Sequence, residues 1–158
     1  AGGAFAALFA SVVLCAILVA SGTLERYFGA LVYLVFFGWL SGLGLSQLYK
    51  IVPFLTWLEC YGPVMGRKPT PRVQDLVAER RDGPWFVLYF AGVFISTGAL
   101  LAEEPALFRF GATATCLATI AIVIELILAR RLANVSAAIR LPDGARRPCL
   151  FVAVSSGR

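Results

Sequence analysis

The sequence predicts an all-α integral membrane protein with four transmembrane helices. Hydrophobic residues make up 59% of the 158 residues, whereas a soluble domain holds roughly 45–50%. The mean hydropathy is +0.82, and the excess apolar residues gather into runs of about 20, the length that crosses about 30 Å of hydrocarbon. The chain has room for four such runs and little else. We therefore expect a single membrane domain over residues 1–158.

The predicted spans follow the apolar runs and lie at about 4–22, 28–49, 85–102 and 106–129. A very short connection around Thr23 joins the first two spans. A tight turn at Glu103, Glu104 and Pro105 joins the last two. Pro105 suits the first turn of the fourth helix, because the backbone N–H that proline lacks would have no partner there.

The longest connection, 50–84, begins with a further apolar piece at 51–58. This piece either extends the second helix beyond the membrane surface or lies in the interface, where its tryptophan suits the headgroup level. Further along, 71–81 is predicted to form a short surface helix, which can begin at its proline. The basic tail, 130–158, contains an apolar segment that would form a short strand or a docking segment.

Basic residues are divided unevenly between the connections. The loop 50–84 and the tail 130–158 hold twelve of the 14 Lys and Arg residues, and the remaining two are Arg26 and Arg109. Connections rich in Lys and Arg stay in the cytoplasm. The sequence therefore predicts a multi-pass protein of the cell inner membrane with both termini in the cytoplasm. The net charge of +5 then reflects orientation, and we expect no nucleic-acid partner.

Several kinds of chemistry are missing from the residue inventory. The chain has no histidine, which excludes His-ligated haem, His-ligated metals and His proton relays. The four cysteines are widely spaced with no CxxC, so neither a disulfide framework nor a metal knuckle is implied. No P-loop, GxSxG or polar cluster of carboxylates is present. We expect no enzymatic activity and no cofactor held through His, but a lipid or pigment bound at subunit contacts is compatible with the sequence.

Small residues are expected to mediate helix packing. They fall on one face of the predicted helices, and those singled out are Gly38, Gly42, Gly92, Gly111 and Thr115. Small side chains let helix backbones approach closely in lipid, where packing drives association. A chain rich in Ala and Gly also gives such stripes by chance, so the stripes alone do not establish contacts.

Glu125 is the only acidic residue well inside a long apolar run. It shares a face with the small residues of the fourth span, so it is expected to point at a neighbouring helix. Three interpretations remain open. Glu125 snorkels or pairs with a base such as Lys50 or Arg130; it is a neutral hydrogen-bonding acid at a subunit contact; or it binds a proton, an ion or a pigment.

The segment QLYKIVPFLTWLECYG at 47–62 is the most distinctive in the chain. It resembles a LYKIVPFL-type segment of bacterial polytopic membrane proteins related to haem–copper oxidase subunits. Such relatives carry histidines near the positions of Gln47 and Glu59, and neither residue is histidine here. The resemblance covers 16 of the 158 residues. It implies a relative that has lost its haem ligands and persists as a scaffold, and no catalytic residue is carried over.

These observations favour an accessory, non-catalytic subunit that scaffolds or stabilises a larger bacterial bioenergetic complex, respiratory or photosynthetic. Its expected partners are other integral membrane subunits and lipids. A small transporter or channel component that uses Glu125 is the first alternative. A membrane enzyme that acts on lipid is the second. The alternatives differ in what they require of Glu125 and of the surfaces between helices.

Overall fold

A computed structural model describes residues 2–62, 72–76, 79–133 and 135. Within these ranges every regular element is a helix, and four helices are long and apolar enough to cross a membrane. The predicted all-α class with four apolar spans is therefore confirmed. The side of the membrane on which the termini lie stays a prediction. The segment 149–154, considered as a strand, lies outside the described residues.

The first span is α1 (Gly2–Ala20), and α2 (Leu24–Tyr33) follows it after a short turn. Gly22 closes α1 in the left-handed region at φ 69. The N–H groups of Gly22 and Thr23 donate to carbonyls of the last turn of α1, at 3.2 and 3.0 Å. These two bonds form a Schellman motif, whose left-handed residue is usually glycine because it has no Cβ to clash. The motif explains how three residues suffice to reverse the chain.

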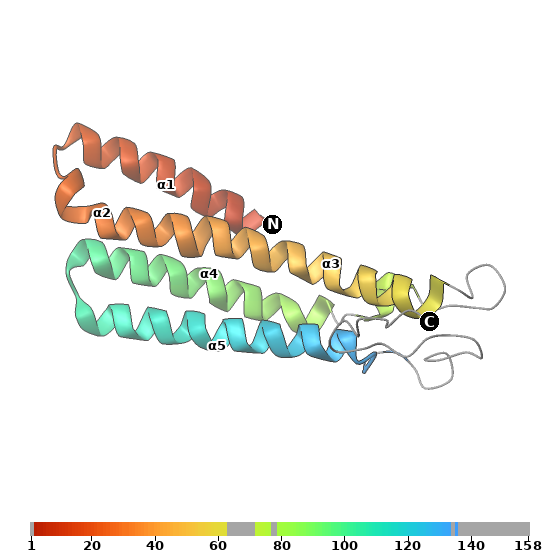
Figure 1. The fold of residues 1–158 in the computed structure, drawn as a ribbon. Coiled ribbons are helices and arrows are strands. Elements are labelled where there is room, and N and C mark those ends of the chain that lie inside the picture. Colours follow the sequence, from red (N-terminus) through yellow and green to blue (C-terminus); the bar gives the residue numbers. More distant parts are fainter. Residues whose placement is uncertain (1, 63–71, 77–78, 134, 136–158) are drawn as a thin grey trace, which may run out of the picture. The chain divides into compact units, whose positions relative to one another are not determined.

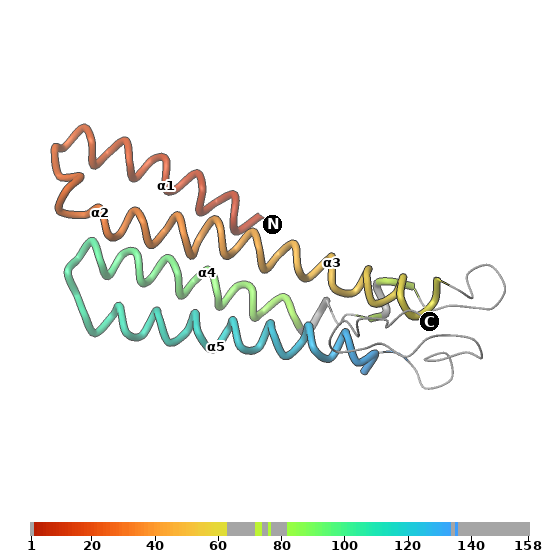
Figure 2. The backbone as a smooth tube through the Cα atoms, viewed as in Figure 1, coloured from red at the N-terminus to blue at the C-terminus, as the bar shows by residue number. Residues whose placement is uncertain are grey.

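The second span is longer than predicted. α2 runs directly into η1 (Leu34–Ser41), a π-helix, and then into α3 (Gly42–Tyr61), as the unbroken tube in Figure 2 shows. Of the two interpretations of 51–58, the structure therefore has the one in which the helix continues. A π-helix of eight residues is unusual, because such turns mostly appear singly within α-helices and often mark functional sites.

The remaining elements are η3 (Val73–Leu76), a short 3₁₀ helix, α4 (Glu79–Ala102) and α5 (Pro105–Arg130). In place of one surface helix at 71–81, the structure has η3, and α4 begins before the predicted third span. An acidic residue in the first turn, Asp82, suits the positive end of the helix dipole and favours this earlier start. As predicted, α5 begins at Pro105.

The chain divides into two compact units, 1–48 with 80–123 and 49–79 with 124–158. In the first unit α1 lies against α2 and η1, and α4 and α5 form a helical hairpin (Figure 1). The second unit has a small core of its own, made by Cys60, Tyr61, Leu76, Leu132 and Val135. α3 and α5 each supply residues to both units.

The α4–α5 hairpin is held by direct contact between helix backbones. A Cβ placed on Gly92 would lie 2.8 Å from the Gly111 carbonyl oxygen, and one placed on Gly111 would lie 2.8 Å from the Ser96 nitrogen. The Thr115 hydroxyl oxygen also lies close to Gly92, 2.5 Å from the position that a Cβ on Gly92 would take. No side chain larger than hydrogen fits at either glycine without moving the backbone.

Two further glycines receive side chains from neighbouring helices of the first unit. At Gly38 an added Cβ would meet the Ala7 side chain of α1 at 2.8 Å. At Gly42 it would meet the Phe90 ring of α4 at 2.7 Å. Both glycines therefore serve packing within this chain.

Membrane orientation can be tested with one native and one introduced cysteine. Because Cys60 is buried in the second unit, it would resist labelling from either side. Glu104 is exposed in the α4–α5 turn, and the positive-inside rule places it outside. We expect a membrane-impermeant thiol reagent to label Glu104→Cys in intact cells and to leave Cys149 unlabelled, while lysed membranes label both. The reverse pattern in intact cells would overturn the predicted orientation.

Candidate functional site

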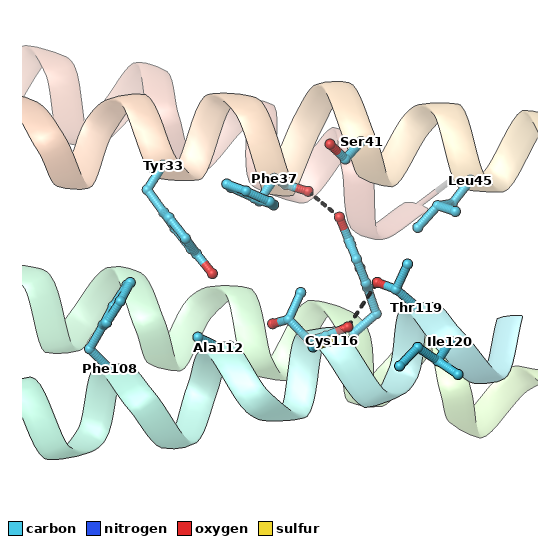
Figure 3. Close-up of a pocket in the computed structure, with 11 residues that line it drawn as sticks. Tyr33, Phe37, Ser41, Leu45, Phe108, Ala112, Cys116, Thr119 and Ile120 are labelled. Atoms are coloured by element: carbon cyan, nitrogen blue, oxygen red, sulfur yellow. Dashed lines mark hydrogen bonds between the residues drawn. The ribbon is translucent and has the colours of Figure 1, made fainter. Parts of the chain in front are cut away.

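A partly open groove in the first unit is the candidate site. Its volume is about 730 Å³, within the range of pockets that bind small molecules. It is bounded by α2, η1 and the start of α3 on one side and by α5 on the other (Figure 3). The residues that line it are Tyr33, Phe37, Ser41, Leu45, Tyr89, Phe108, Ala112, Thr115, Cys116, Thr119 and Ile120.

The spacing of the lining residues follows from the helices that carry them. Tyr33, Phe37, Ser41 and Leu45 recur every fourth residue, which keeps them on one face of a continuous helix. The two aromatic rings of this set are in contact, because Tyr33 stacks on Phe37 with 4.7 Å between ring centroids. Tyr33 also meets Phe108 of α5 edge to face at 5.7 Å. The aromatic end of the groove is thus a set of fixed flat surfaces.

The π-helix provides a backbone acceptor inside the groove. The Tyr89 hydroxyl of α4 donates to the Phe37 carbonyl oxygen at 2.6 Å, drawn as a dashed line in Figure 3. In hydrocarbon such bonds matter, because water cannot replace them.

The threonines of the groove use their protons within α5. Thr115 donates to the Gly111 carbonyl at 2.9 Å, and Thr119 donates to the Thr115 carbonyl at 2.8 Å. Tyr33 differs from them. Its ring points across the groove toward α5 in Figure 3, and no residue in the described part of the chain accepts a hydrogen bond from its hydroxyl.

The groove carries no formal charge along its described lining, which holds no Asp, Glu, Lys or Arg. Its polar side-chain atoms are hydroxyls and one thiol, that of Cys116, which is exposed. Hydroxyls need a neighbouring base before they can act as nucleophiles. The arrangement is suited to binding an apolar molecule and orienting it by a few hydrogen bonds.

One ion pair of the first unit joins the start of α2 to the α4–α5 turn. Arg26 at the start of α2 contacts Glu103 at the α4–α5 turn, with Nη2 2.7 Å and Nε 2.8 Å from the same carboxylate oxygen. Both side chains are mostly exposed, so the pair contributes little to stability by itself. A smaller cavity of about 390 Å³ adjoins Glu103 and Glu104 and shares Phe108 with the groove.

The second unit contains a more buried ion pair. Arg130 at the end of α5 lies 2.6 Å from the Glu59 carboxylate of α3. The other guanidinium nitrogen donates to the Thr56 hydroxyl at 3.2 Å. Thr56 in turn donates to the Val52 carbonyl at 2.7 Å. The guanidinium thus joins the last turns of α3 and α5 within this unit.

Of the two residues proposed for an intramembrane polar contact, Glu125 is half-buried and Lys50 is exposed. Arg130, one of the bases considered for Glu125, has Glu59 as its close partner. The sequence interpretation did not anticipate the Glu59–Arg130 pair, because it placed Glu59 in the connection 50–84 and not in a helix. Glu59 lies instead in the last turn of α3.

The groove was also missed from the sequence. The available signal was the four-residue repeat of Tyr33, Phe37, Ser41 and Leu45, which places two aromatic rings, a hydroxyl and a leucine on one face. Such a face looks like ordinary lipid contact until the opposite wall, α5, is known. The role of Tyr89 could not be predicted from the sequence either, because it depends on one hydrogen bond from α4 to the Phe37 carbonyl of η1.

Comparison with protein-family models, with curated proteins and with solved structures found no significant match to this chain.

Proposed function

We propose that this chain is an accessory, non-catalytic transmembrane subunit that stabilises a larger bacterial bioenergetic complex, respiratory or photosynthetic. The observation that supports the non-catalytic role is the groove, whose described lining offers shape and hydroxyls but no charge. A subunit role is supported by how few described residues lie outside the helices. Nearly all of the described chain is helical, and turns of a few residues join α1 to α2 and α4 to α5. Little polar surface is left there for a soluble substrate.

A transporter or channel component is the second candidate, and the half-buried Glu125 of α5 is the observation that favours it. An ion pathway through a membrane needs a series of polar groups. The hydroxyls of Thr97 and Thr115 bond to their own helices at 2.9 Å, which commits them to the fold. A lipid-acting enzyme is the third candidate. Its general base would have to come from outside the described lining of the groove, which holds no Asp, Glu or Lys.

The subunit proposal predicts a stoichiometric partner. We expect the tagged chain, purified from native membranes in mild detergent, to bring the same integral membrane proteins in fixed ratio. A photo-crosslinking residue at Phe9 or Phe110, whose side chains are 72% and 65% exposed, should capture them. The matched control is the same residue at Val93, which is buried and should react only within the chain. Recovery of the chain alone, with no protein crosslinked from either exposed site, would contradict the proposal.

Glu125→Gln separates the subunit from the transporter. Gln keeps the size and hydrogen bonding of the side chain but removes its charge. If the chain is a subunit, we expect Glu125→Gln to co-purify with its partners as the unchanged chain does. Glu125→Leu should reduce recovery, because a polar partner left unsatisfied costs about 1–3 kcal/mol. Loss of ion flux in vesicles with Glu125→Gln, while assembly stays normal, would instead support the transporter.

A further inference from the structure

We propose that the groove between α2–η1–α3 and α5 binds a lipid-soluble molecule with a carbonyl oxygen on a flat ring, of the isoprenoid quinone type, and that Tyr33 donates the hydrogen bond that orients it. All the residues that line the groove belong to this chain, so binding does not depend on assembly with other subunits.

The size of the groove suits a small molecule. Its volume of about 730 Å³ lies within the range of about 300–1,000 Å³ that is typical of small-molecule sites. A flat ring with a single apolar tail is small enough to enter a groove of this size.

The hydroxyls of the lining differ in their hydrogen bonding. The hydroxyl protons of Tyr89, Thr115 and Thr119 already have acceptors in the fold. The Tyr33 hydroxyl points into the groove and has no acceptor among the residues that the structure describes. A hydroxyl without a partner in an apolar medium is costly. An occupant that brings an acceptor oxygen to this point removes that penalty.

The depth of the Tyr33 hydroxyl in the membrane limits which molecules can accept its hydrogen bond. Ala112, which faces Tyr33 across the groove in Figure 3, follows Pro105 by seven residues, or about 10 Å along α5. This point lies inside the predicted span, where a phospholipid tail offers only methylene groups. A phospholipid tail would thus fill the groove but leave Tyr33 unsatisfied. A ring carbonyl on a long apolar tail reaches this depth, and the faces of Tyr33, Phe37 and Phe108 can stack on the ring.

The test uses the purified full chain and a native reporter. Cys116 is exposed and lines the groove, whereas Cys15 lies outside it. We expect decylubiquinone to slow maleimide labelling of Cys116, measured peptide by peptide, and to leave Cys15 unaffected. Decylbenzene, which has a ring and the same tail but no carbonyl, should protect Cys116 about tenfold more weakly, because one hydrogen bond is worth up to about that factor.

Three variants complete the test. Tyr33→Phe keeps the ring and should lose about tenfold in affinity for decylubiquinone without any change for decylbenzene. Ala112→Leu narrows the groove and should weaken both probes, whereas Ala106→Leu, at an exposed alanine of the same helix outside the lining, should weaken neither. Equal protection by the two probes, or unchanged quinone affinity in Tyr33→Phe, would overturn the carbonyl assignment. Absence of protection by both probes would overturn the site itself.

Discussion

Gly92→Leu is expected to prevent the chain from folding normally. The added side chain would point at the Gly111 carbonyl oxygen and the Thr115 nitrogen, 2.8 and 2.9 Å from its Cβ. Backbone atoms of a helix cannot rotate away as a flexible side chain can, so α4 and α5 would have to separate. Overpacking of a core typically costs 1–3 kcal/mol, and a clash with backbone belongs at or above the upper end of that range.

Gly98 provides the matched control for this prediction. It lies in α4, between one and two turns beyond Gly92, and a Cβ placed there meets nothing within 4 Å. We expect Gly98→Leu to give monodisperse protein in detergent with a melting temperature at or slightly above that of the unchanged chain, because Gly disfavours a helix interior. Gly92→Leu should give aggregated or low-yield protein. Similar melting temperatures for the two variants would show that α4 and α5 do not meet at Gly92 and Gly111.

Arg130→Ala is expected to loosen the second unit. Arg130 and Glu59 are 21% and 36% exposed, so solvent screens part of their attraction, and removal of one partner should cost about 1–3 kcal/mol. The loss includes the hydrogen bond to Thr56. Amide hydrogen exchange should rise in the last turns of α3 and α5, while the α4–α5 hairpin around Gly92 exchanges as before. The effect is local because Arg130 contacts residues of its own unit.

Two comparisons make the Arg130 prediction specific. Arg131 is the next residue and is exposed, so Arg131→Ala should change stability by less than about 0.5 kcal/mol. Arg130→Ala combined with Glu59→Gln should be less damaging than Arg130→Ala alone, since it leaves no half-buried carboxylate without its partner. Equal effects of Arg130→Ala and Arg131→Ala would mean that the pair with Glu59 does not hold this unit together.

Hydropathy alone was enough to predict four apolar helices, because crossing a membrane depends on the composition and length of each segment and not on its neighbours. The turns could also be predicted from the sequence. Pro105 begins α5 as predicted, since proline suits a first turn wherever it occurs. The glycines at 92 and 111 could be marked as sites of close approach, because small size is a local property.

Other features depend on which helices meet, and the sequence leaves this open. A glycine admits a neighbour but does not select it, so only the tertiary structure pairs Gly92 with Gly111 and Gly42 with Phe90. Charge is no more selective: nothing in the sequence pairs Arg130 with Glu59 rather than with another carboxylate, and the fold brings these two together. The groove follows from the same limitation. Tyr33 and Phe108 lie 75 residues apart, and a cavity exists only where the faces of two helices are placed together without filling the space between them.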